Sequence, residues 1–181
     1  MRRAWICIIV TMLVSAGAVV GGARAASASR SRAPTRAQIR HAVRRAERSR
    51  YLWATVNICR SHGHRGGLVG IRGEMGALGF RSTLSMTIRL RQYDRSRRRY
   101  VPLKGATATR TVRLGPLRRG IHQDGAEFRF SSQTGRLDAQ VTFSWTRGRR
   151  RLGIVTRATT SGHHTAAFAQ PARYSAAHCT L

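Results

Sequence analysis

The sequence predicts an all-β protein: an immunoglobulin-like or fibronectin-like antiparallel β-sandwich preceded by a signal peptide and a short basic helix. Two stretches, Leu84–Leu90 and Leu137–Trp145, alternate between apolar and polar residues, which is the period of a strand with one buried face. Seven to nine such short stretches are separated by glycine-, proline- or aspartate-containing turns, a spacing typical of a sandwich. Two cysteines, Cys59 and Cys179, lie near the two ends of this pattern.

The first 25 residues have the order of a secretory signal peptide. A basic start, Met1–Arg3, precedes the apolar run Ala4–Val20, and Ala23–Ala25 supplies the small-x-small pattern of a cleavage site. The apolar run is near the lower limit for crossing a bilayer and contains small and polar residues, so cleavage is preferred over a lasting anchor. We therefore expect a secreted, extracellular protein that begins near Ala26 and has no integral membrane span.

Residues 26–50 are expected to form a basic leader. The first part is rich in alanine, serine and arginine and lacks apolar periodicity, so we expect it to be disordered. Thr35 can cap a short helix that ends at about Ser49, with Ile39, Val43 and Ala46 on one face and arginines on the other. Such a helix can lie on an anionic membrane or a nucleic acid, but packing against its own domain with solvated arginines is the preferred interpretation.

Residues 51–181 are expected to form the sandwich domain. Besides the two strong strands, weaker strands are predicted at Leu52–Cys59, Leu68–Arg72, Arg98–Leu103, Thr107–Leu114, Glu127–Phe130, Leu152–Thr159 and Ala176–Leu181. Two sheets that face each other would bury the large apolar residues Trp145, Phe143, Phe128, Phe130, Ile88 and Val141.

Cys59 and Cys179 are the cysteines that remain after cleavage, because Cys7 lies in the removed segment. In an oxidising compartment such a pair is most simply a disulfide, which would tie the first strand to the last. Two free buried thiols would survive poorly outside the cell. A metal site with the nearby histidines is the other alternative, although Cys-x2-His-x-His matches no usual zinc spacing.

The net charge of +28 arises because only six acidic residues oppose 34 basic ones, of which Lys104 alone is not arginine. Cleavage would leave +25, since the removed segment carries three arginines. GC-rich coding also favours arginine, but a surface of this charge attracts polyanions whatever its origin. The runs Arg95–Arg99, Arg118–Arg119 and Arg147–Arg151 all lie at predicted turns. We assign polyanion binding to Arg97, Arg98, Arg99, Arg149, Arg150 and Arg151.

The sequence contains no recognisable catalytic motif, so we expect the protein to have no enzymatic activity and to bind no cofactor. Neither a Gly-x-Ser-x-Gly elbow, a His-Glu-x-x-His motif nor a phosphate-binding glycine loop occurs. A pair of carboxylates for glycoside hydrolysis could come only from Glu47, Glu74, Asp94, Asp124, Glu127 or Asp138. Asp94 is expected to stabilise a turn and to neutralise the arginines around it. Asp138 is expected to pair with an arginine on a neighbouring strand. Asp124 and Glu127 are expected to flank a Gly-Ala turn.

Histidines in two loops are the best candidates for a hidden site. His62 and His64 lie in one loop and His163 and His164 in another, and the two loops could meet at one end of a sandwich and hold copper, nickel or zinc. Exposed loop histidines with weak metal affinity are the favoured alternative, because no acidic or thiolate partner is near them in sequence. We assign no metal site.

Four segments carry a resemblance: LWATVNIC at Leu52–Cys59, VGIRG at Val69–Gly73, TTSGH at Thr159–His163 and YSAAHCT at Tyr174–Thr180. Together they resemble a group of small secreted proteins of high-GC bacteria to which no activity is assigned. The resemblance covers nearly the whole domain. It implies secretion and the cysteine pair, and it implies no chemistry. Arg60 departs from the acidic residue expected after the first cysteine.

Two functions remain open. The first is a secreted binding module whose arginine-rich turns hold anionic extracellular polymers such as nucleic acid or wall polymers. The second is a structural or protein-interaction domain of the cell envelope whose charge is incidental. If the arginines gather on one contiguous face, the binding function is favoured. If they are spread evenly over the surface, the structural function is favoured. Tyr93 and Tyr100 beside the first run could stack on bases or sugars, or simply cover the hairpin.

Overall fold

The computed structural model describes residues 33–132 and 134–181, so the expected signal peptide (residues 1–25) and residues 26–32 of the expected leader lie outside the described residues. Within the described ranges one α-helix, α1 (Arg36–Glu47), precedes nine strands, and two short 3-10 helices, η1 (Gly63–Arg65) and η2 (Ala106–Ala108), lie between strands. The strands are β1 (Trp53–Ser61), β2 (Gly67–Gly76), β3 (Ser82–Asp94), β4 (Arg99–Pro102), β5 (Thr109–Leu117), β6 (Ile121–Phe130), β7 (Arg136–Arg147), β8 (Arg150–Ala158) and β9 (Cys179–Thr180).

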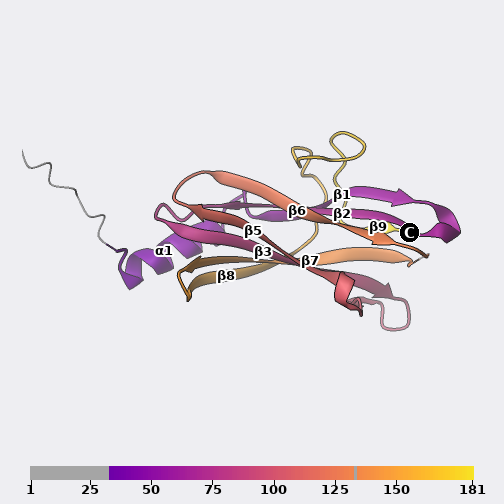
Figure 1. The fold of residues 1–181 in the computed structure, drawn as a ribbon, viewed down its shortest axis with the longest axis horizontal. Coiled ribbons are helices and arrows are strands. Elements are labelled where there is room, and N and C mark those ends of the chain that lie inside the picture. Colours follow the sequence, from indigo (N-terminus) through magenta and orange to yellow (C-terminus); the bar gives the residue numbers. More distant parts are fainter. Residues whose placement is uncertain (1–32, 133) are drawn as a thin grey trace, which may run out of the picture. The chain divides into compact units, whose positions relative to one another are not determined.

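The strands form two antiparallel sheets (Figure 1). The smaller sheet has the order β1-β2-β6. In the larger sheet β3 and β7 are central, β4 and β5 share the free side of β3, and β8 and β9 share the free side of β7. The predicted antiparallel all-β class with a short N-terminal helix is therefore confirmed.

The two sheets share one hydrophobic core. The alternating residues of β3 and β7 supply its centre, and Ile88, Val141, Phe143 and Trp145 are fully buried. The Trp145 indole also donates a hydrogen bond from Nε1 to the carbonyl oxygen of Gly76 at 2.9 Å. Of the six residues expected in the core, five are buried and Phe130 is partly buried.

Helix α1 packs its apolar stripe against the end of this core. Thr35 caps the helix, as expected, and forms a capping box with Gln38; Ile39 and Ala42 are buried. Val43 lies so close to Gly153 of β8 that a Cβ on this glycine would be 2.6 Å from Val43 Cγ1. The arginines of the helix therefore project into solvent, which is the arrangement preferred from the sequence.

The cysteines Cys59 and Cys179 form a disulfide, with Cα atoms 5.4 Å apart. This bond joins β1 of the smaller sheet to β9, which pairs with only two residues of β7 in the larger sheet. The expected last strand, Ala176–Leu181, is shorter than predicted because the preceding chain leaves the ladder as a long loop.

That loop, residues 159–178, packs against the smaller sheet and rises beside β1 and β2 in Figure 1. The side chain of Asn57, 1% exposed, donates to the carbonyl oxygens of Ala167 and Phe168 at 3.0 and 3.3 Å. Across the residues that the structure describes, no helix is both long and apolar enough to span a membrane.

One predicted turn is wrong. Gly125 and Ala126 lie inside β6, opposite Arg72 and Ile71 of β2, and do not form a turn between Asp124 and Glu127. A Cβ on Gly125 would overlap the carbonyl oxygen of Ile71. The small residue is therefore required by the close approach of two strands, which a single sequence does not distinguish from a turn.

Candidate functional site

The first arginine triplet follows β3. Arg97 and Arg98 lie in the turn and Arg99 begins β4, and all three are exposed. Asp94 organises this turn, because its Oδ1 accepts hydrogen bonds from the backbone N–H groups of Ser96 and Arg97 at 2.9 and 3.1 Å. The Ser96 hydroxyl, these N–H groups and the Arg97 guanidinium, 3.7 Å away, hold the Asp94 pKa below its usual value. The predicted turn chemistry is thus confirmed, and Asp94 partly compensates this triplet.

The second triplet lies in the hairpin between β7 and β8. Arg147 pairs with Arg150 across a two-residue turn, Gly148–Arg149. Gly148 has φ +57°, which suits the first position of a type II′ turn. Arg149, Arg150 and Arg151 are exposed, and no carboxylate lies in residues 147–151 at this turn.

The structure does not bring the two triplets together. The ladder of β3 places Asp94 opposite Arg99, whereas the other end of β3, at Thr83, faces Thr146. The thirteen residues of β3 make the two turns roughly 40 Å apart. By contrast, Leu117 pairs with Ser82, so the Arg118–Arg119 turn lies at the same end as the second triplet.

This end also carries α1. Arg45 and Gly120 line one pocket of about 390 Å³, which places the helix next to the turn after β5. A second hollow of about 470 Å³ lies along the helix and has three arginine side chains in its wall. We call this surface the basic end and define it by its exposed arginines Arg40, Arg44, Arg45, Arg48, Arg81, Arg118, Arg119, Arg147, Arg149, Arg150 and Arg151.

Most carboxylates are engaged elsewhere. Asp138 on β7 accepts a bidentate contact from Arg91 on β3 at 2.9 and 2.6 Å, so the expected cross-strand pair is confirmed. Burial raises the Asp138 pKa although Arg91 opposes this shift. Asp124 and Glu127 on β6 pair with Arg72 and Arg129. Among the described residues, none of these ion pairs includes an arginine of the basic end, and Glu47 is the only carboxylate on α1 or in the turns that form this end.

Glu74 belongs to a buried cluster that sequence reasoning missed. Its carboxylate, in a residue only 8% exposed, accepts hydrogen bonds from Trp53 Nε1 at 2.9 Å and Gln123 Nε2 at 2.7 Å. The ring of His163 stacks on Trp53 with centroids 4.4 Å apart. Burial lowers the His163 pKa, opposed by the charge of Glu74.

This cluster joins β1, β2 and β6 to the 159–178 loop, since Gln123 also accepts a hydrogen bond from Ala167 N at 2.8 Å. Its polar groups satisfy one another, so we regard it as a device that holds the loop. The sequence did offer one indication of this cluster, because the N–H group of a buried tryptophan such as Trp53 needs a hydrogen-bond acceptor. The expected strand ended at Arg72, however, and so left Glu74 unplaced.

The two histidine loops do not meet, contrary to one of the alternatives considered. His62 and His64 follow the last residue of β1, whereas His163 stacks on Trp53, the first residue of the same strand. The nine residues of β1 separate the loops by roughly 27 Å. Within residues 33–132 and 134–181, no group of three or more His, Cys, Asp or Glu side chains is arranged to hold a metal ion.

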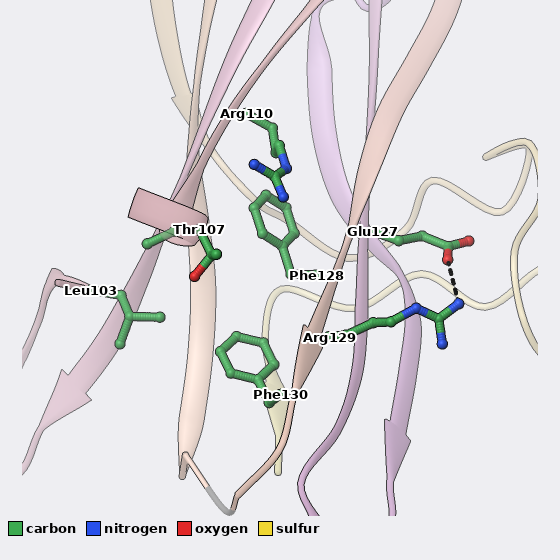
Figure 2. A pocket seen from close by; sticks show the side chains of 8 residues that line it. Leu103, Thr107, Arg110, Glu127, Phe128, Arg129 and Phe130 are labelled. Carbon is green, nitrogen blue, oxygen red and sulfur yellow. Dashed lines mark ion pairs between the residues drawn. The ribbon is translucent and has the colours of Figure 1, made fainter. Parts of the chain in front are cut away.

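A further pocket of about 390 Å³ lies at the edge of the sheets (Figure 2). Phe128 and Phe130 point from β6 toward Leu103 and Thr107, and Arg110 lies beyond the Phe128 ring. Glu127 and Arg129 point to the other side of β6, where they form the ion pair drawn. The wall of this pocket is therefore an extension of the core, with no paired polar groups converging in it.

No family model, curated protein or solved structure matches the chain. The charged surface described above therefore carries the functional argument.

Proposed function

We propose that the chain is a secreted, immunoglobulin-like binding domain that holds anionic extracellular polymers through the basic end. The observation that carries this proposal is the segregation of charge: eleven exposed arginines from α1 and three turns share one surface with a single carboxylate. Nucleic acid and anionic wall polymers are the ligand classes. The protein acts by binding and performs no catalysis.

Counterion release explains how such a surface binds. Each arginine that neutralises a phosphate or another anionic group frees a condensed cation, so affinity falls steeply as salt rises. Since no base-reading element is apparent, binding depends little on sequence. The turn with Arg97, Arg98 and Arg99 lies several Debye lengths away and acts as a separate, weaker contact that only a long polymer reaches.

The strand order supports the immunoglobulin-like assignment. Sheet β1-β2-β6 corresponds to strands A, B and E of that plan, and β4-β3-β7-β8 corresponds to C′, C, F and G. The disulfide between β1 and β9 replaces the B–F bond of antibody domains. Export is supported by the order of residues 1–25 and by this disulfide, because such bonds persist in oxidising compartments.

The test compares two matched triple variants of the mature protein, each with the same loss of charge. Replacing Arg149, Arg150 and Arg151 by Gln should lower heparin and duplex DNA affinity strongly and reduce the magnitude of the salt slope by up to about 3. The same replacement of Arg97, Arg98 and Arg99 should have a smaller effect, because Asp94 already compensates part of that charge. Both variants keep the strand ladders and should unfold like the parent.

Two outcomes contradict the proposal. If neither heparin nor DNA retains the parent protein at about 0.1 M salt, where screening is still moderate, polyanion binding is excluded. If the two triple variants lose equal affinity, the basic end has no special role and the charge acts through its total alone.

One observation favours the second function, a protein-interaction domain. Phe168, at the surface of the 159–178 loop, is 75% exposed and has φ +57°, a left-handed conformation that is costly for a bulky residue. The Asn57 side chain holds the backbone in this conformation by donating hydrogen bonds to the carbonyl oxygens of Ala167 and Phe168. A photo-crosslinking residue at position 168 that repeatedly labels one envelope protein, in a manner insensitive to salt, would establish this function.

A further inference from the structure

A second cluster of cations and aromatic rings lies at the end opposite the basic end. Tyr93 of β3 and Tyr100 of β4 face each other in the ladder, with ring centroids 5.3 Å apart in an edge-to-face arrangement. The Arg136 guanidinium, at the start of β7, lies 5.6 Å from the Tyr93 ring and 5.9 Å from the Tyr100 ring. We call Tyr93, Tyr100, Arg95 and Arg136 the aromatic corner.

The aromatic corner borders a pocket. A hollow of about 530 Å³ is lined by Gln92, Tyr93, Arg95, Gly135, Arg136 and Thr180, which include two guanidinium groups, an aromatic ring and no carboxylate. The acids nearest in the ladder are already engaged, since Asp138 binds Arg91 and Asp94 organises its own turn. The pocket therefore has positive charge that no side chain in its wall neutralises.

A hydroxyl in the same corner lacks a partner. Tyr100 Oη is buried and has no hydrogen bond among the described residues. Two guanidinium groups lie near its ring, Arg91 at 5.6 Å and Arg136 at 5.9 Å from the centroid. Buried polar groups in folded proteins are usually paired, so this corner contains a polar group that the described side chains leave unsatisfied.

We propose that the aromatic corner binds single-stranded nucleic acid, with a base against the Tyr93 ring and adjacent phosphates at Arg95 and Arg136. Stacking on an aromatic side chain requires an unpaired base, and arginine on both sides supplies the backbone contacts. Neither a duplex, whose bases are stacked on each other, nor a polymer without bases can use the ring in this way. This inference deepens the proposed function and rests on polyanion binding for the phosphate contacts.

The experiment compares two fluorescein-labelled 20-nucleotide probes of equal charge: oligothymidine and an abasic phosphodiester chain. Fluorescence anisotropy with the mature protein should give about tenfold tighter binding of oligothymidine. Tyr93→Leu should abolish this difference and leave abasic binding unchanged, whereas Tyr93→Phe, which keeps the ring, should preserve it. Arg136→Gln should weaken both probes and reduce the salt slope by about 0.7.

Tyr51→Leu is the matched control. Tyr51 also has an arginine over its ring, with Arg50 4.8 Å from the centroid, but it lies outside the aromatic corner. The ratio of the two affinities should not change in this variant. Thermal unfolding of each variant shows whether the fold is intact, and Tyr93→Phe keeps the test valid if Tyr93→Leu fails to fold.

The outcomes separate this inference from the proposed function. Equal affinity of the parent for both probes overturns the inference and leaves polyanion binding in place. Failure of both probes to bind overturns the two together. A preference for oligothymidine that survives in Tyr93→Leu, or that is lost in Tyr93→Phe, shows that the ring is not the base contact and also overturns the inference.

Discussion

Removing the disulfide should destabilise the protein more than any other single change to a covalent or non-covalent contact described above. The bond between Cys59 and Cys179 closes a loop with a sequence separation of 120 residues. Restriction of the unfolded chain by a loop of this length gives a stabilisation of about 5 kcal/mol in the chain-entropy model, and most measured bonds deliver about 2–4 kcal/mol. For a domain of this size, a loss of about 4 kcal/mol lowers Tm by roughly 10 °C.

The structure also predicts where the variant loosens first. Strand β9 makes ladder contacts with only two residues, Arg136 and Leu137, and its end is held by reciprocal backbone hydrogen bonds between Gly135 and Leu181 at 2.8 and 3.0 Å. Without the cross-link this short strand has few other contacts to keep it in place. The Leu181 amide should therefore lose hydrogen-exchange protection well before the amides in the middle of β7.

Urea unfolding of Cys59→Ala/Cys179→Ala, measured on the mature protein, checks the magnitude. The parent protein with a reductant is the matched control and should give the same loss of unfolding free energy. Mass spectrometry of the unreduced parent should show the two cysteine-containing peptides joined. An unfolding free energy within about 1 kcal/mol of the parent, or alkylation of both thiols without prior reduction, would refute this reasoning.

Three further predictions follow from single features. Gly153→Ala should cost about 1–3 kcal/mol, measured by urea unfolding, because the added Cβ overlaps Val43 and displaces α1; an unchanged stability would contradict the close packing. Burial lowers the pKa of His163 and of His178, so the unfolded chain takes up protons first as pH falls below about 6.5, and the unfolding free energy should decrease from pH 7.5 to 5.5. His163→Gln should make this decrease smaller. If the variant shows the same pH dependence as the parent, the lowered pKa of His163 is not its cause. N-terminal sequencing of exported protein should begin within a few residues of Ala26, and recovery of the uncleaved chain in a membrane fraction would disprove cleavage.

Strand positions were predictable from the sequence because burial alternates with the strand period. Leu84–Leu90 and Leu137–Trp145 were placed correctly as strands, and the helix capped by Thr35 was placed to within about two residues. Local patterns carry no information about partners, however. The position of Gly125 inside β6 depends on the nearby backbone of β2, which is more than fifty residues away in the sequence.

The candidate site was only partly predictable for the same reason. The arginine runs were correctly placed at or next to turns, since glycine and aspartate mark those turns. Which turns share an end depends on the pairing of β3 with β5 and β7, and this pairing separates Arg97 from Arg149 and joins Arg118 to the second hairpin. Glu74 was missed because its importance arises from Trp53 on a neighbouring strand and from Gln123 on the other side.

The distribution of carboxylates, more than the number of arginines, distinguishes a binding surface from a compositional excess. Coding bias adds arginines without regard to acids, so acids at random positions would neutralise each arginine-rich turn to a similar degree. In the described residues five of the six carboxylates lie on β2, β3, β6 and β7, where they contact arginine, amide or indole groups. Glu47 is the only carboxylate on α1 or in the turns of the basic end. Asp94 and Asp138 lie toward the opposite end of β3 and β7, well beyond the screening length of about 8 Å at physiological salt, so these two acids do not reduce the potential at the basic end. In the proposed function, a polyanion therefore meets arginine charge there that these two carboxylates do not offset, which is the condition that counterion release requires.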